Sequence, residues 1–377
     1  MTIHRNPTIS FNVIFGEIEL KSPYLWVGGD PSKPLSDDMR ITHQGRSDTV
    51  KRALSDFGIE DSFNKAAKRF EEHYHYPIGI STVDRTTKEI AKEASVYIDE
   101  KLSSVNTKDD AKSILMQEKI LVELDGCEIR TGELKLIENS DEKTCKHNNR
   151  KKAKIIKWRD VRLGFARPLE EKEKIFVGKM DSYPEVVGQL HSAAELIGMT
   201  SATDVIGVSD GGIGLSEELK RQFTNMQFIL DKSHLRDHFY DTADKMGLCK
   251  QDRTKWVEPR IKEISNGEVH KTIEELEKLV IKKEKAKKPC ARLKRLIGYL
   301  NRFSDALYYN NFKEKGYPIG SGEIESAHKS VPQQRLKIPG ATWHPDSIDP
   351  MLALRVLRAD DWWEDFWDQR TNIILAA

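Results

Sequence analysis

The spacing of apolar residues divides the chain into a helical N-terminal part, a mixed middle part and a second helical stretch. From Thr49 onward apolar side chains recur every three or four residues, which predicts amphipathic helices. Residues 73–77 interrupt this pattern, and Ser81 is suited to cap the next helix. Residues 1–40 are weakly patterned, and their glycines and prolines predict a loop-rich leader. The short helices are compatible with a helix-turn-helix DNA reader, and equally with many small helical bundles.

The middle part alternates short apolar runs with helical patterns. The predicted strands are 120–124, 158–165, 174–177, 204–208 and 228–230, and the predicted helices are 184–197, 215–223 and one that begins at 234. From about residue 241 to residue 312 the pattern is helical throughout. This order predicts an α/β protein in which a mixed sheet carries helices on its faces.

Length and composition narrow the class of protein. The 377 residues predict two or three domains, and 61 Lys and Arg against 60 Asp and Glu leave a net charge of +1. No apolar run is long enough for a membrane-spanning helix, and the N-terminus lacks the apolar segment of a signal peptide. The four cysteines are far apart and form no CxxC pair, which argues against a disulfide framework or a zinc module. We therefore expect a cytoplasmic protein.

The small net charge hides blocks of opposite sign. Between Lys143 and Arg167 there are ten Lys and Arg residues and one acid, and between Lys278 and Arg295 there are nine and one. Residues 360–368 reverse the sign, with acids interleaved among three tryptophans. Such blocks can build a cationic surface without a high net charge, although each run alone is also compatible with a solvated helix face or loop.

Three carboxylates are candidates for chemistry. Asp125 and Asp210 each close a predicted strand and precede a glycine, a position where open α/β sheets bind ligands. Glu325 lies in a glycine-rich segment that opens a helix, where an ionised acid is stabilised. Gathered together, they would repel one another unless cations such as Mg²⁺ or Mn²⁺ lay between them. Taken singly, each is also an ordinary turn or helix-start residue.

The order of these segments resembles a known family. Residues 316–325, with 334–337, Gly340 and Trp343, resemble the glutamate region of bacterial insertion-sequence transposases. The match is to the DD-E group related to Mutator elements, in the Kra-type branch. The segments 123–126, 206–211 and 229–234 match the two aspartate strands and the Asp-x-x-His segment in the same order, and the tail 361–367 is also similar. The resemblance covers roughly residues 120–370.

The resemblance implies an RNase H-like catalytic core interrupted by an α-helical insertion. The expected parts are an N-terminal helical region at 1–110, the first part of the core at 111–240, the insertion at 241–315 and the second part of the core at 316–377, which ends in the acidic, Trp-rich tail. Relatives often carry an N-terminal cysteine-rich zinc module, which this chain lacks. Pro332 is expected to kink or end the glutamate helix about two turns beyond Glu325.

The resemblance also implies the site. Asp125, Asp210 and Glu325 are expected to be the catalytic triad that binds two Mg²⁺ or Mn²⁺ ions. Glu325 is preferred over Glu323 because the family spacing is Gly-Ser-Gly, two residues and then Glu. The expected residues around the triad are His234, Asp231 and Glu123. The expected contacts to DNA are Lys151, Lys152, Lys154, Arg335 and Lys337, while Trp343 fits either the core or a base-stacking wedge.

The resemblance predicts a DDE transposase that cleaves element ends and joins the freed 3′-hydroxyl to target DNA. The expected partner is double-stranded DNA, held by a homodimer or higher assembly at the bacterial nucleoid, with no membrane contact. Both basic stretches are placed to bind DNA backbone, the first beside the site. Two alternatives remain open. One is an RNase H-like nuclease without strand transfer, and the other is a non-catalytic DNA-binding protein, either domesticated or decayed.

Overall fold

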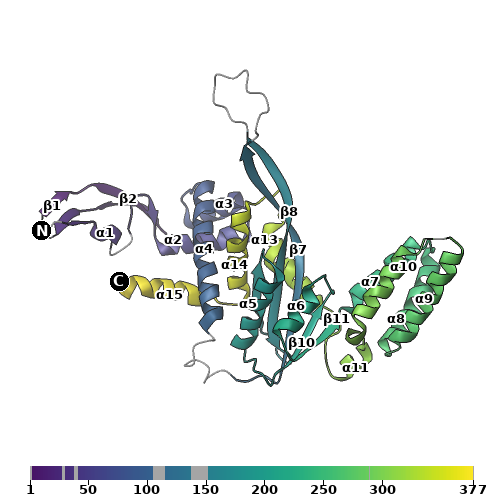
Figure 1. The fold of residues 1–377 in the computed structure, drawn as a ribbon. Helices are drawn as coiled ribbons and strands as arrows, with labels where there is room; N and C mark the ends of the chain where they lie inside the picture. Colours follow the sequence, from purple (N-terminus) through teal and green to yellow (C-terminus); the bar gives the residue numbers. More distant parts are fainter. Residues whose placement is uncertain are drawn as a thin grey trace, which may run out of the picture.

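A five-stranded mixed sheet forms the centre of the protein (Figure 1). The structure, a computed structural model, describes residues 2–27, 30–37, 41–104, 115–136, 152–287 and 289–376. The strand order is β11-β10-β7-β8-β9, in which β10 runs parallel to both neighbours while β7, β8 and β9 pair antiparallel. The strands are β7 (Lys119–Leu136), β8 (Lys152–Pro168), β9 (Ile175–Lys179), β10 (Asp204–Ser209) and β11 (Met226–Leu230). The predicted α/β class is confirmed.

Helices cover both faces of this sheet. On one face α5 (Tyr183–Leu196) packs closely, and its Leu190 lies where a Cβ on Gly164 would meet it at 3.5 Å. On the other face α14 (Ile348–Ala359) approaches Gly178 through Leu352, beside α12 (Gly322–His328). The apolar residues of the middle strands, such as Leu121, are fully buried because they lie between these layers. Two more helices follow β10 and β11, namely α6 (Leu215–Gln222) and α7 (Lys232–Lys245).

The first long strand continues well past its predicted end. Asp125-Gly126 was expected to turn the chain, but β7 pairs with β8 without a break from Ile120 to Leu136. Gly126 lies opposite Arg162 in this ladder. A local turn signal was outweighed by cross-strand pairing, which satisfies the backbone N–H and C=O groups on both sides of the dipeptide. The result is a long β-hairpin that projects beyond the sheet (Figure 1).

The N-terminal part contains strands that the sequence pattern did not predict. Two three-stranded sheets and a short helix precede the helical region, so the description of residues 1–110 as helical was wrong for this segment. Its elements are β1 (Thr2–Arg5), β2 (Thr8–Val13), β3 (Gly16–Lys21), β4 (Tyr24–Val27), β5 (Asp30–Ser32), α1 (Pro34–Asp37) and β6 (Gly45–Arg46). In β2 the apolar residues Ile9, Phe11 and Val13 alternate with polar ones, and Ile9 and Phe11 are buried, so a period of two was present as a signal for this strand. The strands β3 and β5 are mostly exposed.

Three helices then pack together and against the core. They are α2 (Asp48–Glu60), α3 (Phe63–Tyr74) and α4 (Ile80–Ser103), and α4 is capped by Gly79 rather than by the expected Ser81. The helical prediction for this segment is confirmed, while its relation to a helix-turn-helix reader stays a prediction. Val50, Leu54 and Phe70 are buried among these helices.

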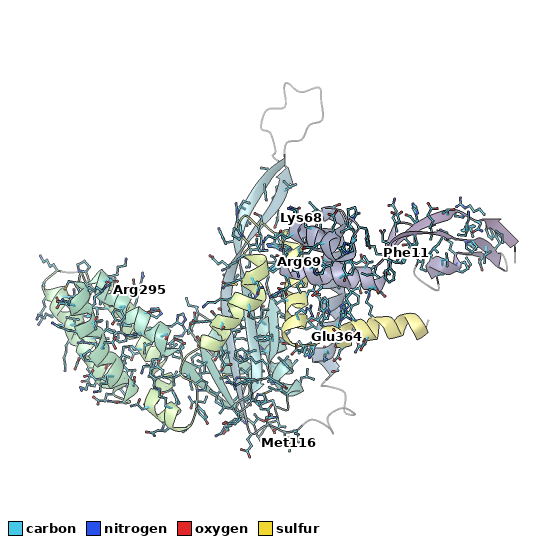
Figure 2. All side chains as sticks on the ribbon, turned by 180° about the vertical axis from the view of Figure 1, so that it is seen from behind. Phe11, Lys68, Arg69, Met116, Arg295 and Glu364 are labelled. Atoms are coloured by element: carbon cyan, nitrogen blue, oxygen red, sulfur yellow. The ribbon has the colours of Figure 1, made fainter. Side chains whose placement is uncertain are left out.

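A helical insertion separates β11 from the glycine-rich loop, as expected. It comprises α8 (Lys250–Ser265), α9 (Val269–Lys285), α10 (Ala291–Arg302), η3 (Ser304–Ala306) and α11 (Tyr309–Glu314). The N-terminal strands and this insertion project from opposite sides of the sheet, and Figure 2 marks them with Phe11 and Arg295. In the described part of the chain no helix is both long and apolar enough to cross a membrane.

Pro332 changes the glutamate helix without ending the helical path. After α12 the chain forms the π-helix η4 (Lys329–Gln333), followed by α13 (Gln334–Leu336), η5 (Pro345–Ser347), α14 and α15 (Trp363–Ala376). Proline donates no hydrogen bond, so the carbonyl group four residues earlier, at His328, loses its usual helical donor. The buried Arg355 donates to the carbonyl oxygens of Ser330 and Val331 and thereby holds the π-helical turn around Pro332.

Candidate functional site at the end of β10

Strand pairing brings Asp125 and Asp210 together. β10 pairs with β7 up to Val208 opposite Glu123, and the next two residues carry the chain to Asp210, level with Asp125. Burial raises the pKa of Asp125, and the nearby Asp210 charge raises it further, whereas the Gly126 N–H and His328 act in the opposite direction. Two carboxylates from sequence positions far apart are therefore neighbours at the carboxyl end of β10.

The glycine after Asp210 is required by close packing. Gly211 has φ of +75°, and a Cβ there would lie 2.7 Å from Leu230 Cδ1 and 2.9 Å from the Phe303 ring. Both the left-handed backbone and the lack of space exclude a side chain. The Asp210 carboxylate accepts a hydrogen bond from the Gly212 N–H at 2.9 Å, which fixes it at this turn.

Helix α12 lies across β7 beside these aspartates. The Ile324 N–H donates to Glu123 Oε2 at 2.9 Å, and one helical turn later His328 Nε2 lies 4.0 Å from Asp125 Oδ2. Four helix residues rise about 6 Å and two strand residues span about 6.7 Å, so Ile324 and His328 are spaced nearly as far apart as Glu123 and Asp125. Glu123 and Asp125 therefore share the strand face that supports the helix.

Asp231 holds the start of α7 against the glycine-rich loop. Its carboxylate caps α7 by accepting from the His234 N–H at 2.7 Å. It also accepts from the Ser321 N–H at 2.5 Å and the Ser321 hydroxyl at 2.9 Å. Asp231 is 1% exposed and its oxygens are occupied by these donors. It thus positions two elements of the site, His234 and the start of α12.

The two glutamates of α12 have different surroundings. Glu325 is about half exposed, and its Oε1 lies 3.6 Å from His234 Nε2. Glu323 points instead to Arg167 at 2.7 Å and Lys174 at 2.6 Å. Burial alone would raise the pKa of Glu323, but these two cations outweigh it and hold the pKa below its usual range. Glu325 is therefore the glutamate of this helix that is free to approach the aspartates.

Glu123 is a buried carboxyl on β7 that holds the backbone of α12. It is 1% exposed, and burial raises its pKa to about 8 despite the hydrogen bond from Ile324. Its Oε2 receives the α12 backbone, so Glu123 is engaged as a helix anchor. Its expected role beside the triad stays a prediction, and the protonated form suits this buried environment.

Three residues near the aspartates were not singled out from the sequence. His328 is 2% exposed and faces Asp125, and no described residue reaches full hydrogen-bond geometry with either ring nitrogen. His238 lies one turn after His234 on α7. Burial lowers the pKa of His238, and the nearby Asp210 charge acts in the opposite direction. Tyr299, from the helical insertion, donates to the Asp210 carbonyl oxygen at 2.9 Å. Each falls at an ordinary helical position, and the spacing of His234 and His238 by four residues was the one available signal.

The expected DNA contacts are dispersed. Lys151 lies outside the described residues, Lys152 begins β8, and Lys154 is exposed on the projecting hairpin. Lys154 is nine residues along β8 from Leu163, the partner of Asp125, which corresponds to about 30 Å. The described part of the first basic stretch therefore begins far from the site at Lys152 and ends beside it, where Arg162 lies opposite Gly126. Contact of Lys152 and Lys154 with DNA stays a prediction. Lys337 is exposed just after α13.

Arg335 has a structural role in place of the expected phosphate contact. It is 3% exposed, its guanidinium lies over the Phe63 and Trp343 rings, and it donates to the Gly58 carbonyl oxygen at 2.8 Å. Trp343 is likewise buried and donates to the Leu336 carbonyl oxygen at 3.0 Å. Together they join the N-terminal helices to the core, so Trp343 is a core residue and not a wedge.

The chemistry of the converging groups fits a divalent cation. Carboxylate oxygens are the ligands that Mg²⁺ and Mn²⁺ prefer. The pKa of Asp125 is raised mainly by burial and to a smaller extent by the Asp210 charge, and a bound cation would offset both. Among the described residues, no three His, Cys, Asp or Glu side chains already stand close enough to hold a metal ion. Full convergence therefore requires Glu325, the most exposed of the three carboxylates, to turn from His234 toward the aspartates.

No known protein family and no curated protein matches this chain.

Proposed function

We propose that the chain is a DDE transposase of the Kra-type branch related to Mutator elements, with an RNase H-like core. The observation that carries the proposal is the meeting of Asp125, Asp210 and the Glu325 helix at one sheet end. These residues are separated by at least 85 positions, and strand register and helix docking bring their elements together. The helical insertion between β11 and α12 has the place that the family resemblance requires.

In this proposal Asp125, Asp210 and Glu325 hold two divalent cations. Bound there, the cations would activate the attacking hydroxyl group and stabilise the leaving oxygen of a phosphodiester. His234 orients Glu325, His328 supports Asp125, and Asp231 fixes the elements that carry His234 and Glu325. These contacts restrict the carboxylates before any ion binds.

Two reactions would use the same site. In the first, water attacks a phosphodiester at the element end, and the broken P–O bond leaves a free 3′-hydroxyl. In the second, that hydroxyl attacks a target phosphodiester, forming one P–O bond and releasing the target strand's own 3′-oxygen. Double-stranded DNA is the substrate of both steps, and a dimer or larger assembly is needed to hold two ends.

The test is cleavage and joining of DNA carrying the ends of the element that encodes the chain. Purified protein is incubated with these ends and a target plasmid, with Mg²⁺ or with EDTA, and products are resolved on denaturing gels. We expect Mg²⁺-dependent cutting and joined products from the wild type and neither from Asp210→Asn. Cutting without joining would indicate an RNase H-like nuclease. Equal DNA binding by both proteins without cutting would indicate a non-catalytic DNA-binding protein.

A further inference from the structure

The outer half of the β7–β8 hairpin has an exposed face that the site does not use. We define the distal ribbon as residues 129–136 of β7 and 152–159 of β8, which project beyond the sheet (Figure 1). Paired residues of an antiparallel ladder share a face, and successive pairs alternate between faces. One face, named the Trp158 face, carries the pairs Arg130–Trp158, Gly132–Ile156 and Leu134–Lys154.

The two faces of the ribbon differ in burial, while both carry cations. The opposite face buries Ile129 and Thr131 against the body of the protein, and its Glu133 is paired with Arg159 at 3.0 Å. Within the ribbon the Trp158 face carries Arg130 and Lys154, and the next pair of this face toward the core is acidic, Glu128–Asp160. It thus combines two cations with apolar side chains on a surface that faces solvent.

The apolar side chains of this face are unusually open. Trp158 is 59% exposed, Leu134 67% and Ile156 38%. In the described part of the chain no aromatic ring or cation stacks on Trp158, although many other rings of this protein have such a neighbour. Single exposed apolar residues are common on protein surfaces. Several of them grouped on a projecting, cationic element indicate an interaction surface.

We propose that the distal ribbon binds duplex DNA through its Trp158 face, with Trp158 and Leu134 in a groove and Arg130 and Lys154 on the flanking phosphates. The inference rests on the proposed function and specifies how that function engages its substrate. A two-stranded ribbon fits the major groove, which is about 12 Å wide, and β-ribbon readers of DNA use this geometry. The distal ribbon as a whole matches a polyanion, because it carries six Lys and Arg residues against the single acid Glu133. Apolar contact with bases suits the unstacked Trp158 ring.

The salt dependence of binding separates the two kinds of contact. The logarithm of the binding constant falls with the logarithm of salt concentration by about 0.9 for each phosphate neutralised. Arg130→Ala and Lys154→Ala are each expected to reduce this slope by about one phosphate. Trp158→Ala is expected to weaken binding about tenfold without changing the slope, because stacking and apolar contact release no counterions. Trp158→Phe keeps a ring and is expected to recover most of the affinity.

The experiment measures fluorescence anisotropy of a labelled duplex carrying the element end, titrated with full-length protein in EDTA over a range of salt concentrations. Met116→Ala and Lys172→Ala are matched controls, an exposed apolar residue before β7 and an exposed cation after β8, both outside the ribbon. Thermal unfolding of each variant verifies the fold. The ribbon variants are expected to change the affinity or the salt slope of DNA binding, and the controls are expected to change neither.

Three outcomes decide the proposal. Affinities and slopes equal to those of the wild type in all ribbon variants would overturn it. A shift of oligomeric state in sedimentation, with DNA binding unchanged, would also overturn it by assigning the face to a second copy of the chain. The expected pattern in a protein that never cuts DNA with Mg²⁺ would support the ribbon and refute only the transposase activity.

Discussion

The β7–β8 hairpin is one ladder with two environments. Its inner half consists of residues 120–128 and 160–168, and its outer half is the distal ribbon. In the inner half Leu121, Leu163 and Phe165 are completely buried between helical layers. In the outer half Leu134 and Trp158 stand in solvent, although the backbone pairing continues unbroken. Hydrogen bonding extends a strand wherever a partner strand continues, whereas burial requires a covering layer. Where the layers end, apolar side chains become available for a partner.

The largest expected effect concerns the chemistry at the inner half. Asp210→Asn removes one charge from the carboxylate pair at the end of β10 and is expected to reduce Mg²⁺-dependent DNA cleavage by roughly 10³-fold or more. Binding through the outer half should be unchanged. Gel assays of cleavage and anisotropy of DNA binding measure the two halves separately. Loss of both properties together would mean that the halves are not independent.

The next effect compares burial directly. Phe165→Ala leaves a cavity in the buried inner half and is expected to lower the free energy of unfolding by about 3–5 kcal/mol. Leu134→Ala, on the exposed outer half, is expected to change it by no more than about 0.5 kcal/mol. Urea denaturation of both variants measures the difference. Similar losses would show that the outer half is packed against another surface in solution.

A smaller effect concerns the support of Asp125 by His328. His328→Gln removes the imidazole that faces the Asp125 carboxylate and is expected to weaken Mn²⁺ binding about tenfold. His191→Gln is the control, since that residue also faces a carboxylate, Glu195 at 3.5 Å, and lies beside Thr203 at the far end of β10. Isothermal titration with Mn²⁺ measures both. An unchanged affinity for His328→Gln would limit this histidine to packing.

The smallest effect concerns the edge of the inner half at β9. Asp360 accepts from the Phe176 N–H at 2.9 Å, and burial raises the pKa of its carboxyl well above the usual range. The folded state therefore binds this proton more tightly than the unfolded state, so the group's contribution to stability falls as pH rises above the unfolded pKa. Asp360→Asn should remove this loss and gain stability relative to wild type between pH 4 and pH 7. Denaturation at both pH values, with the exposed Asp368→Asn as control, tests the sign.

The sequence predicted those elements whose local patterns agree with their surroundings. The strands β10 and β11 and the helices α5, α6 and α7 were expected within a few residues, because their apolar periods match the layers they pack between. The helical insertion was predicted for the same reason. Local signals failed where tertiary pairing overrode them, as at Asp125-Gly126 inside β7. The N-terminal strands were missed although Ile9, Phe11 and Val13 of β2 alternate with polar residues, because the glycines and prolines of this segment predicted loops.

The roles of single side chains could be predicted only where they do not depend on tertiary contacts. Arg335 looked like a phosphate ligand because a cation near a glutamate helix is expected to face DNA, yet Phe63 and Trp343 enclose it. His328 gave no signal, because its function as the neighbour of Asp125 arises only when α12 lies across β7. The sequence does not encode such contacts locally, since they depend on two elements about 200 residues apart.

Periodicity and residue type predicted the order of strands and helices from residue 120 onward, the three candidate carboxylates and the position of the helical insertion. These are local properties of the sequence. The packing of the layers made Asp125 and Asp210 neighbours, paired Glu323 with Arg167 and Lys174 while Glu325 faces His234, and placed Lys154 far from the site but Arg162 beside it. Register, burial and ion pairing join residues distant in the chain, and they are fixed only when the layers pack.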